Sequence, residues 1–103
     1  MESRSPKQII ICIDYDGTFT KIPDLLTEFI KSAKKTGHVV ICATMRHDNE
    51  EEAPAVRAAM DHLVDDIIFT GRQAKEKFLM DQNIHVDIWI DDQPFWIYRD
   101  AIV

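Results

Sequence analysis

Residues 9–18, with the sequence IIICIDYDGT, decide the fold. The first half is an apolar, mostly β-branched run, which is typical of a strand buried on both faces of a parallel sheet. Asp14 and Asp16 follow at once, and Gly17 lets the chain turn sharply. Because ligands bind at the carboxyl ends of strands in open α/β sheets, this stretch predicts both a buried strand and a functional site.

The two carboxylates lie two residues apart. If the strand geometry continued through them, Asp14 and Asp16 would point to the same side of the sheet. Like charges that close repel each other, so the pair requires a cation or a shared proton.

The rest of the chain alternates between helix-like and strand-like segments with short connections. This alternation predicts a single α/β domain over residues 1–103, with a parallel sheet covered by helices on both faces, in three layers. We expect strands over 8–14, 38–43, 66–70 and 86–90, helices over 23–36, 54–63 and 73–82, and a last short strand over 101–103.

Composition narrows the class of protein. Apolar residues make up 46% of the chain, as in a globular domain, and no apolar run approaches the roughly 20 residues of a membrane span. The polar first eight residues lack a secretory apolar region, and Cys12 and Cys42 stand inside apolar runs as buried thiols rather than a disulfide. We therefore expect a cytoplasmic protein without membrane contact.

The formal net charge of −6 argues against tight, nonspecific binding of nucleic acid. Part of this charge is concentrated in two acidic pairs, Asp14 with Asp16 and Asp91 with Asp92. A divalent metal bound there would offset part of this negative charge. A local basic patch on the surface therefore remains an alternative.

Further polar side chains follow the other expected strands. Thr44 ends the second strand, Lys75 stands near the start of the third helix, and Asp91-Asp92 end the fourth strand. Such positions meet at one edge of a parallel sheet. A hydroxyl, an ammonium group and several carboxylates around a metal are what phosphoryl transfer needs, because charge on the phosphate must be neutralised as it reacts.

These motifs, in this order, resemble those of the haloacid dehalogenase (HAD) superfamily of phosphohydrolases. The resemblance covers residues 8–96 and is carried most specifically by Asp14-Tyr15-Asp16-Gly17-Thr18 and by Asp91-Asp92. It implies a Rossmann-like sheet of strand order 4-1-2-3, which places Thr44 on one side of Asp14 and the acidic pair on the other.

The resemblance also implies roles in catalysis. Asp14 would be the nucleophile that forms an aspartyl-phosphate, and Asp16 the general acid and then the general base. Thr44 would hydrogen-bond the phosphate, and Lys75 would pair with Asp14 and the phosphate, with the nearby Lys77 as its competitor for this role. The second aspartate is typical of the phosphatases and argues against dehalogenation.

The resemblance implies Mg²⁺ as the cofactor. The expected metal-binding residues are Asp14, the main-chain carbonyl of Asp16, and the Asp91-Asp92 pair, with Asp92 favoured as the more direct ligand. Oxygen ligands with room for water suit this ion.

The chain is too short for the cap domain that covers most HAD sites. Only Phe19–Ile22 separate the first motif from the first helix, and only Gly71–Ala74 precede the third motif. A capless site admits bulky substrates or gains walls from a partner in a homo-oligomer, although the acidic chain favours a small phosphorylated molecule over a macromolecule.

Several neighbours of the motifs are weaker candidates. Arg46 is expected to contact the substrate phosphate or leaving group, and His47 and Arg72 could add to a basic rim. Trp89 is expected in the core. The aromatic stretch at 93–98 is expected to pack, with a dimer face or a base-stacking wall as alternatives.

The sequence thus predicts a Mg²⁺-dependent phosphatase that hydrolyses a phosphomonoester, with a nucleotide, a sugar phosphate or a nucleic-acid end as the substrate. One alternative is a binding or regulatory module that keeps the fold without turnover. Another is a receiver domain of the response-regulator type, which the order of the motifs disfavours, because there the acidic pair comes before the phosphorylated aspartate.

Overall fold

The computed structural model describes residues 8–101. Four strands alternate with four helices, and a kinked turn, Tyr15–Phe19, follows the first strand. In chain order the elements are β1 (Ile10–Ile13), α1 (Pro23–Lys35), β2 (Val39–Thr44), α2 (Ala53–Met60), β3 (Asp66–Phe69), α3 (Lys75–Met80), β4 (Ile88–Ile90) and α4 (Phe95–Tyr98).

The four strands form one parallel sheet with the order β3-β2-β1-β4, which is the order 4-1-2-3 read from the opposite edge. Strand β1 therefore lies between β2 and β4. Its last residue, Ile13, is in register with Cys42 of β2 and Ile90 of β4. Because these strands end at nearly the same level, the residues that follow them meet at one edge.

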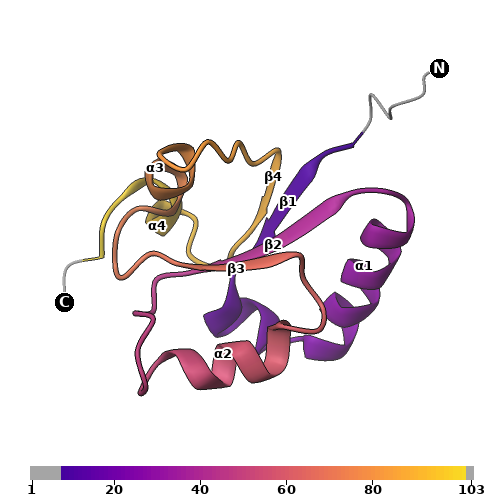
Figure 1. Cartoon of the computed structure of the whole chain (residues 1–103), viewed down its shortest axis with the longest axis horizontal. Coiled ribbons are helices and arrows are strands. Elements are labelled where there is room, and N and C mark those ends of the chain that lie inside the picture. The colour runs from indigo at the N-terminus through magenta and orange to yellow at the C-terminus, as the bar shows by residue number, and fades with distance from the viewer. Residues whose placement is uncertain (1–7, 102–103) are drawn as a thin grey trace.

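Helices cover both faces of the sheet. Figure 1 shows α1 and α2 on one side and α3, with α4 beside it, on the other. Alternate residues of β1 and β2 enter two separate cores because successive side chains point to opposite faces. The core under α1 and α2 contains Ile11, Ile13, Leu26, Ile30, Val40, Cys42, Val56 and Met60, and the core under α3 contains Cys12, Ile41, Ala43, Ile68 and Leu79.

Local signals set the limits of α1. Pro23 occupies the first turn, where its missing N–H group costs nothing, and Lys34 and Lys35 lie in the last turn, where they complement the helix dipole. The chain leaves the helix through Gly37, whose φ of 93° favours glycine. In the part of the chain that the structure describes, no helix is both long and apolar enough to cross a membrane.

Three expectations about the C-terminal third differ from the structure. Strand β4 begins at Ile88 rather than at 86, because the side chain of Asp87 accepts a hydrogen bond from the Ile10 N–H (2.9 Å) while its own N–H donates to the Ile10 carbonyl. The short helix α4 was not expected. Ala101 is not in a strand, and the rest of the expected last strand, 102–103, lies outside the described residues.

Candidate active site

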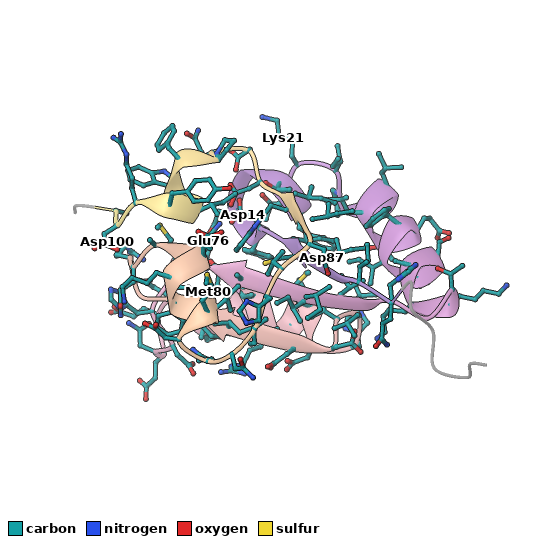
Figure 2. The ribbon with its side chains drawn as sticks, turned by 90° about the horizontal axis from the view of Figure 1, so that it is seen from above. Asp14, Lys21, Glu76, Met80, Asp87 and Asp100 are labelled. Carbon is teal, nitrogen blue, oxygen red and sulfur yellow. The ribbon has the colours of Figure 1, made fainter. Side chains whose placement is uncertain are left out.

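Asp14 lies at the carboxyl end of the central strand and is nearly buried, with 8% of its surface exposed. Its N–H donates to the Ile90 carbonyl of β4 (2.9 Å), so the backbone is still held by the sheet at this point. Figure 2 shows Asp14 near the middle of the molecule, among side chains from the surrounding elements. The chain then turns away through Gly17, whose φ is 77°.

Lys75, the first residue of α3, is buried against two carboxylates. Its ammonium Nζ lies 2.8 Å from Asp14 Oδ1 and 2.5 Å from Asp91 Oδ2. Burial opposes the charge of Lys75, but the two acids outweigh it and raise the pKa of Lys75 above its ordinary value. The ammonium group of Lys75 is therefore a fixed cation beside Asp14. Lys77, the competitor for this role, is exposed and pairs with Asp81.

Burial raises the pKa of Asp14 to about 6, although the Lys75 ammonium lowers it in part. The nearby carboxylate of Asp91 acts in the same direction as burial. Without a metal, this group therefore holds its proton over part of the mildly acidic range, which is typical of carboxylates at functional sites.

The hydroxyl of Thr18 joins Asp14 to Asp92. Thr18 Oγ1 lies 3.0 Å from Asp14 Oδ2 and 3.1 Å from Asp92 Oδ1, and it accepts a hydrogen bond from the Asp92 N–H (3.0 Å). Its single proton can be donated to only one of the two carboxylates at a time. No role for Thr18 is predicted from the sequence, although this residue ends the stretch Asp14-Tyr15-Asp16-Gly17-Thr18.

Three carboxylates could hold a metal ion. Single oxygens of Asp14, Asp91 and Asp92 all lie within 4.8 Å of one another. Asp91 already accepts a hydrogen bond at each oxygen, from Lys75 at Oδ2 and from the Gln93 N–H at Oδ1 (2.9 Å). Asp92 Oδ1 meets Thr18, whereas Oδ2 has no donor among residues 8–101. This difference favours Asp92 as the more direct ligand.

Asp16 does not share a cation with Asp14. The strand geometry ends at Ile13, and Asp16 points to the pocket rim, where its carboxylate forms a two-pronged ion pair with Arg46. The two bonds run from Nε to Oδ2 (2.9 Å) and from Nη2 to Oδ1 (2.8 Å). The condition under which both carboxylates would point to one side is not met, because the strand ends at Ile13 and the chain turns through Asp16 and Gly17.

The end of β2 supplies a second polar side of the site. Thr44 is 1% exposed, and its Oγ1 accepts a weak hydrogen bond from the Arg46 N–H (3.3 Å). The Glu52 carboxylate accepts hydrogen bonds from Arg72 (3.1 and 3.2 Å) and from the His47 N–H (2.7 Å). Such pairings between distant segments leave no local signal in the sequence.

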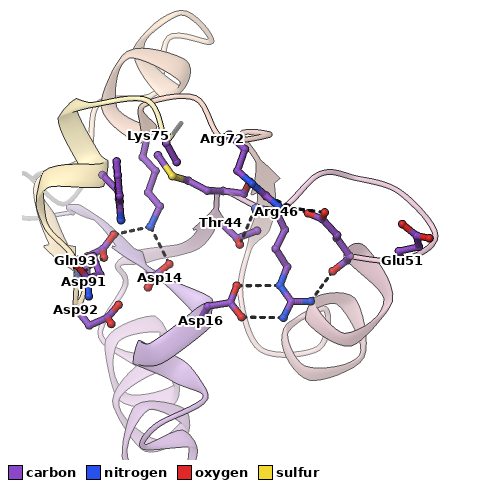
Figure 3. A pocket seen from close by; sticks show the side chains of 14 residues that line it. Asp14, Asp16, Thr44, Arg46, Glu51, Arg72, Lys75, Asp91, Asp92 and Gln93 are labelled. Atoms are coloured by element: carbon purple, nitrogen blue, oxygen red, sulfur yellow. Dashed lines mark hydrogen bonds and ion pairs between the residues drawn. The ribbon is translucent and has the colours of Figure 1, made fainter. Parts of the chain in front are cut away.

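A pocket of about 700 Å³ opens over these groups. Figure 3 shows Asp14, Lys75, Asp91 and Asp92 on one side and the Asp16–Arg46 pair on the other. Trp96 and Met45 form apolar parts of the pocket wall. His47 and Phe95 do not line the pocket. The lining contains Asp14, Asp16, Thr44, Met45, Arg46, Glu51, Glu52, Arg72, Lys75, Asp91, Asp92, Gln93, Trp96 and Ala101. The pocket thus brings together the residues expected to act in catalysis, substrate binding and metal binding, together with Arg72, but it does not include the weaker candidate His47.

No protein-family model matches this chain, and neither a curated protein nor a solved structure does so. Its function is therefore inferred from the chemistry of the pocket.

Proposed function

We propose that the protein is a Mg²⁺-dependent phosphatase of the HAD type, acting on a small phosphomonoester. The observation that carries this proposal is the buried contact between Lys75 and Asp14, beside two further carboxylates able to bind a metal. A cation fixed against a nearly buried carboxylate can hold a phosphate next to a nucleophile of like charge. The Rossmann-like order of the strands, with Asp14 at the end of β1, supports the same proposal.

The first step transfers the phosphoryl group to the protein. A carboxylate oxygen of Asp14 attacks phosphorus, and the bond to the leaving oxygen breaks with its electron pair on that oxygen. Asp16, in its protonated form, donates a proton to the leaving oxygen. Lys75 and the hydroxyl of Thr44 stabilise the phosphate oxygens, with both side chains buried at the pocket floor.

The second step returns the protein to its starting state. Asp16, now a carboxylate, accepts a proton from a water molecule that attacks phosphorus. The bond from phosphorus to the Asp14 oxygen breaks, so inorganic phosphate leaves and the carboxylate is restored. When bound, Mg²⁺ neutralises charge on the phosphate. Asp14 and Asp92 would hold it, with Asp91 supporting from the Lys75 side.

Mg²⁺-dependent phosphate release from nucleotides, sugar phosphates and phosphorylated DNA ends tests this proposal. We expect Asp14→Asn to abolish release, because the amide is a poor nucleophile, and Asp16→Asn to lower it strongly. Asp48→Asn is the matched control, because Asp48 is exposed and pairs with Arg57 outside the pocket. Full activity in Asp14→Asn would refute the mechanism.

A binding or regulatory module is the second candidate, and one observation favours it. Asp16 is engaged with Arg46, so the expected general acid is not directed at Asp14. A folded protein that gains thermal stability from Mg²⁺ but releases no phosphate from any compound would support this reading over the phosphatase.

A further inference from the structure

Arg46 is held in one place by four contacts. Two are the hydrogen bonds to Asp16, and a third runs from Nη1 to the Glu52 carbonyl (2.8 Å). The guanidinium also lies over the Tyr15 ring, 5.2 Å from its centroid. Only 28% of the Arg46 side chain is exposed, so its position is set by the protein rather than by solvent.

Asp16 cannot act as a general acid while it is paired in this way. Both of its oxygens are engaged by the guanidinium, which cannot supply a proton to a leaving group. To protonate a leaving group, Asp16 must first separate from Arg46 and take up a proton from water. The ion pair is therefore a resting arrangement that the catalytic cycle has to open.

Opening the pair frees the Nε and Nη2 donors of Arg46, whose hydrogen bonds among residues 8–101 run to Asp16. The Glu52 carboxylate cannot replace Asp16, because it already accepts from Arg72 and from the His47 N–H. A planar guanidinium fork matches the geometry of a phosphate or carboxylate group. An anionic group of the bound molecule would therefore restore both hydrogen bonds.

We propose that the substrate carries a second oxyanion, a phosphate or a carboxylate, which binds Arg46 in exchange for Asp16 and so releases the general acid. This proposal rests on the phosphatase function proposed above. Lys75 and Arg46 line opposite sides of the pocket, as Figure 3 shows, so the reacting phosphate and the second anion occupy separate places. A volume of about 700 Å³ is large enough for a bisphosphate of a sugar or a nucleoside.

Matched pairs of compounds test the proposal. Fructose 6-phosphate with fructose 1,6-bisphosphate, and adenosine 5′-monophosphate with adenosine 3′,5′-bisphosphate, differ by a second phosphate. Glycerol 3-phosphate with 3-phosphoglycerate differ by a carboxylate. For at least one pair, we expect kcat/KM of the wild-type protein to be about tenfold or more higher for the doubly anionic member, as for a charged, two-pronged contact.

Arg46→Lys tests whether binding of the second oxyanion needs the planar guanidinium group or only its positive charge. Lysine keeps the positive charge but cannot form two parallel bonds to one oxyanion. We expect this variant to lose the preference for the doubly anionic member, because an ammonium group cannot restore both parallel hydrogen bonds to the second oxyanion. Arg57→Lys, which alters an exposed Arg–Asp pair outside the pocket, should leave the preference unchanged.

One result would overturn the proposal: a preference that is unchanged in Arg46→Lys, whether activity on both members of every pair falls equally or not at all. Turnover that survives in Asp14→Asn would refute the phosphatase mechanism but would still leave the preference measurable. If the wild-type protein turns over none of these compounds, calorimetric titration with the same pairs tests the proposal through their binding affinities. Tighter binding of a doubly anionic member, lost in Arg46→Lys, supports the proposal, and equal binding overturns it.

Discussion

Gly17 lies so close to Asp92 that a Cβ atom on residue 17 would stand 2.5 Å from Asp92 Oδ2. The φ of Gly17 is 77°, a conformation that side chains rarely adopt. The glycine of the first motif therefore does two things: it turns the chain after Asp14, and it leaves room for the carboxylate that we place on the metal.

Gly17→Ala is expected to weaken Mg²⁺ binding by about 10- to 100-fold, because the new methyl group displaces Asp92. The left-handed backbone adds a loss of stability of about 1–2 kcal/mol. Gly37→Ala is the matched control, since φ is 93° there but nothing lies within 4 Å of the added Cβ. It should lose similar stability and keep its Mg²⁺ affinity. Equal Mg²⁺ affinities in the two variants, measured by calorimetry, would contradict this account.

Lys75→Met should remove turnover and also destabilise the metal-free protein by about 3 kcal/mol or more, because two buried carboxylates lose their cation. The matched control is Lys77→Met, two residues along the same helix. Lys77 has 80% of its side chain exposed and pairs with Asp81, so its replacement should change stability by no more than about 0.5 kcal/mol. Urea denaturation of both variants without metal measures the difference, and similar losses would argue against a special role for Lys75.

The sequence predicted the parts of the site that depend on strand ends. Asp14 and Asp91 each follow a strand of a parallel sheet and Thr44 ends one, and the order of those strands is enough to bring them to one edge. Lys75 could be chosen over Lys77 only by its position near the start of the helix, and burial then separates the two.

The orientation of Asp16 could not be predicted in the same way. Its direction depends on the kinked turn Tyr15–Phe19, which has no periodic pattern, and on Arg46, which lies 30 residues away in sequence. The same holds for Glu52 and Arg72, which are 20 residues apart. Helix α4 was missed because four residues, Phe95–Tyr98, are too few to show a helical period.

The affinity for Mg²⁺ should fall as the pH is lowered through the pKa of Asp14, which is about 6. A protonated carboxyl competes with the metal, so the apparent dissociation constant should rise about tenfold per pH unit below that value and level off above pH 7. Carbon-detected NMR should give an Asp14 midpoint near pH 6 without metal and a lower one with Mg²⁺. An affinity that is constant between pH 5 and 7 would refute this.

The raised pKa of Asp14 also determines how the stability of the folded protein changes with pH. The unfolded chain releases the Asp14 proton near the ordinary value, 3.8, whereas the folded protein keeps it up to about 6. The folded state thus binds more protons in this window, and the contribution of Asp14 to stability falls as the pH rises through it. In the metal-free protein, Asp14→Asn should therefore remove a pH-dependent loss of stability between pH 4 and 6, which thermal unfolding at several pH values measures.

Cys12 and Cys42 should not react with thiol reagents in the folded protein. They are 1% and 0% exposed, and burial raises the pKa of the Cys12 thiol to about 12, so almost no thiolate is present. They lie in different cores, on opposite faces of the sheet, and therefore do not form a disulfide. A thiol assay should detect both groups in denaturant and neither within minutes in buffer.

Mg²⁺ should slow any residual reaction of Cys12 further. This residue stands two positions before Asp14 on β1, so a reagent reaches it only when the sheet opens, and opening also dismantles the expected metal site. A ligand that binds only the closed state lowers the population of the open one in proportion to its concentration above the dissociation constant. Asp92→Asn is the control, because it should lose this protection while both thiols stay buried. Equal protection by Mg²⁺ in that variant would show that the ion acts elsewhere.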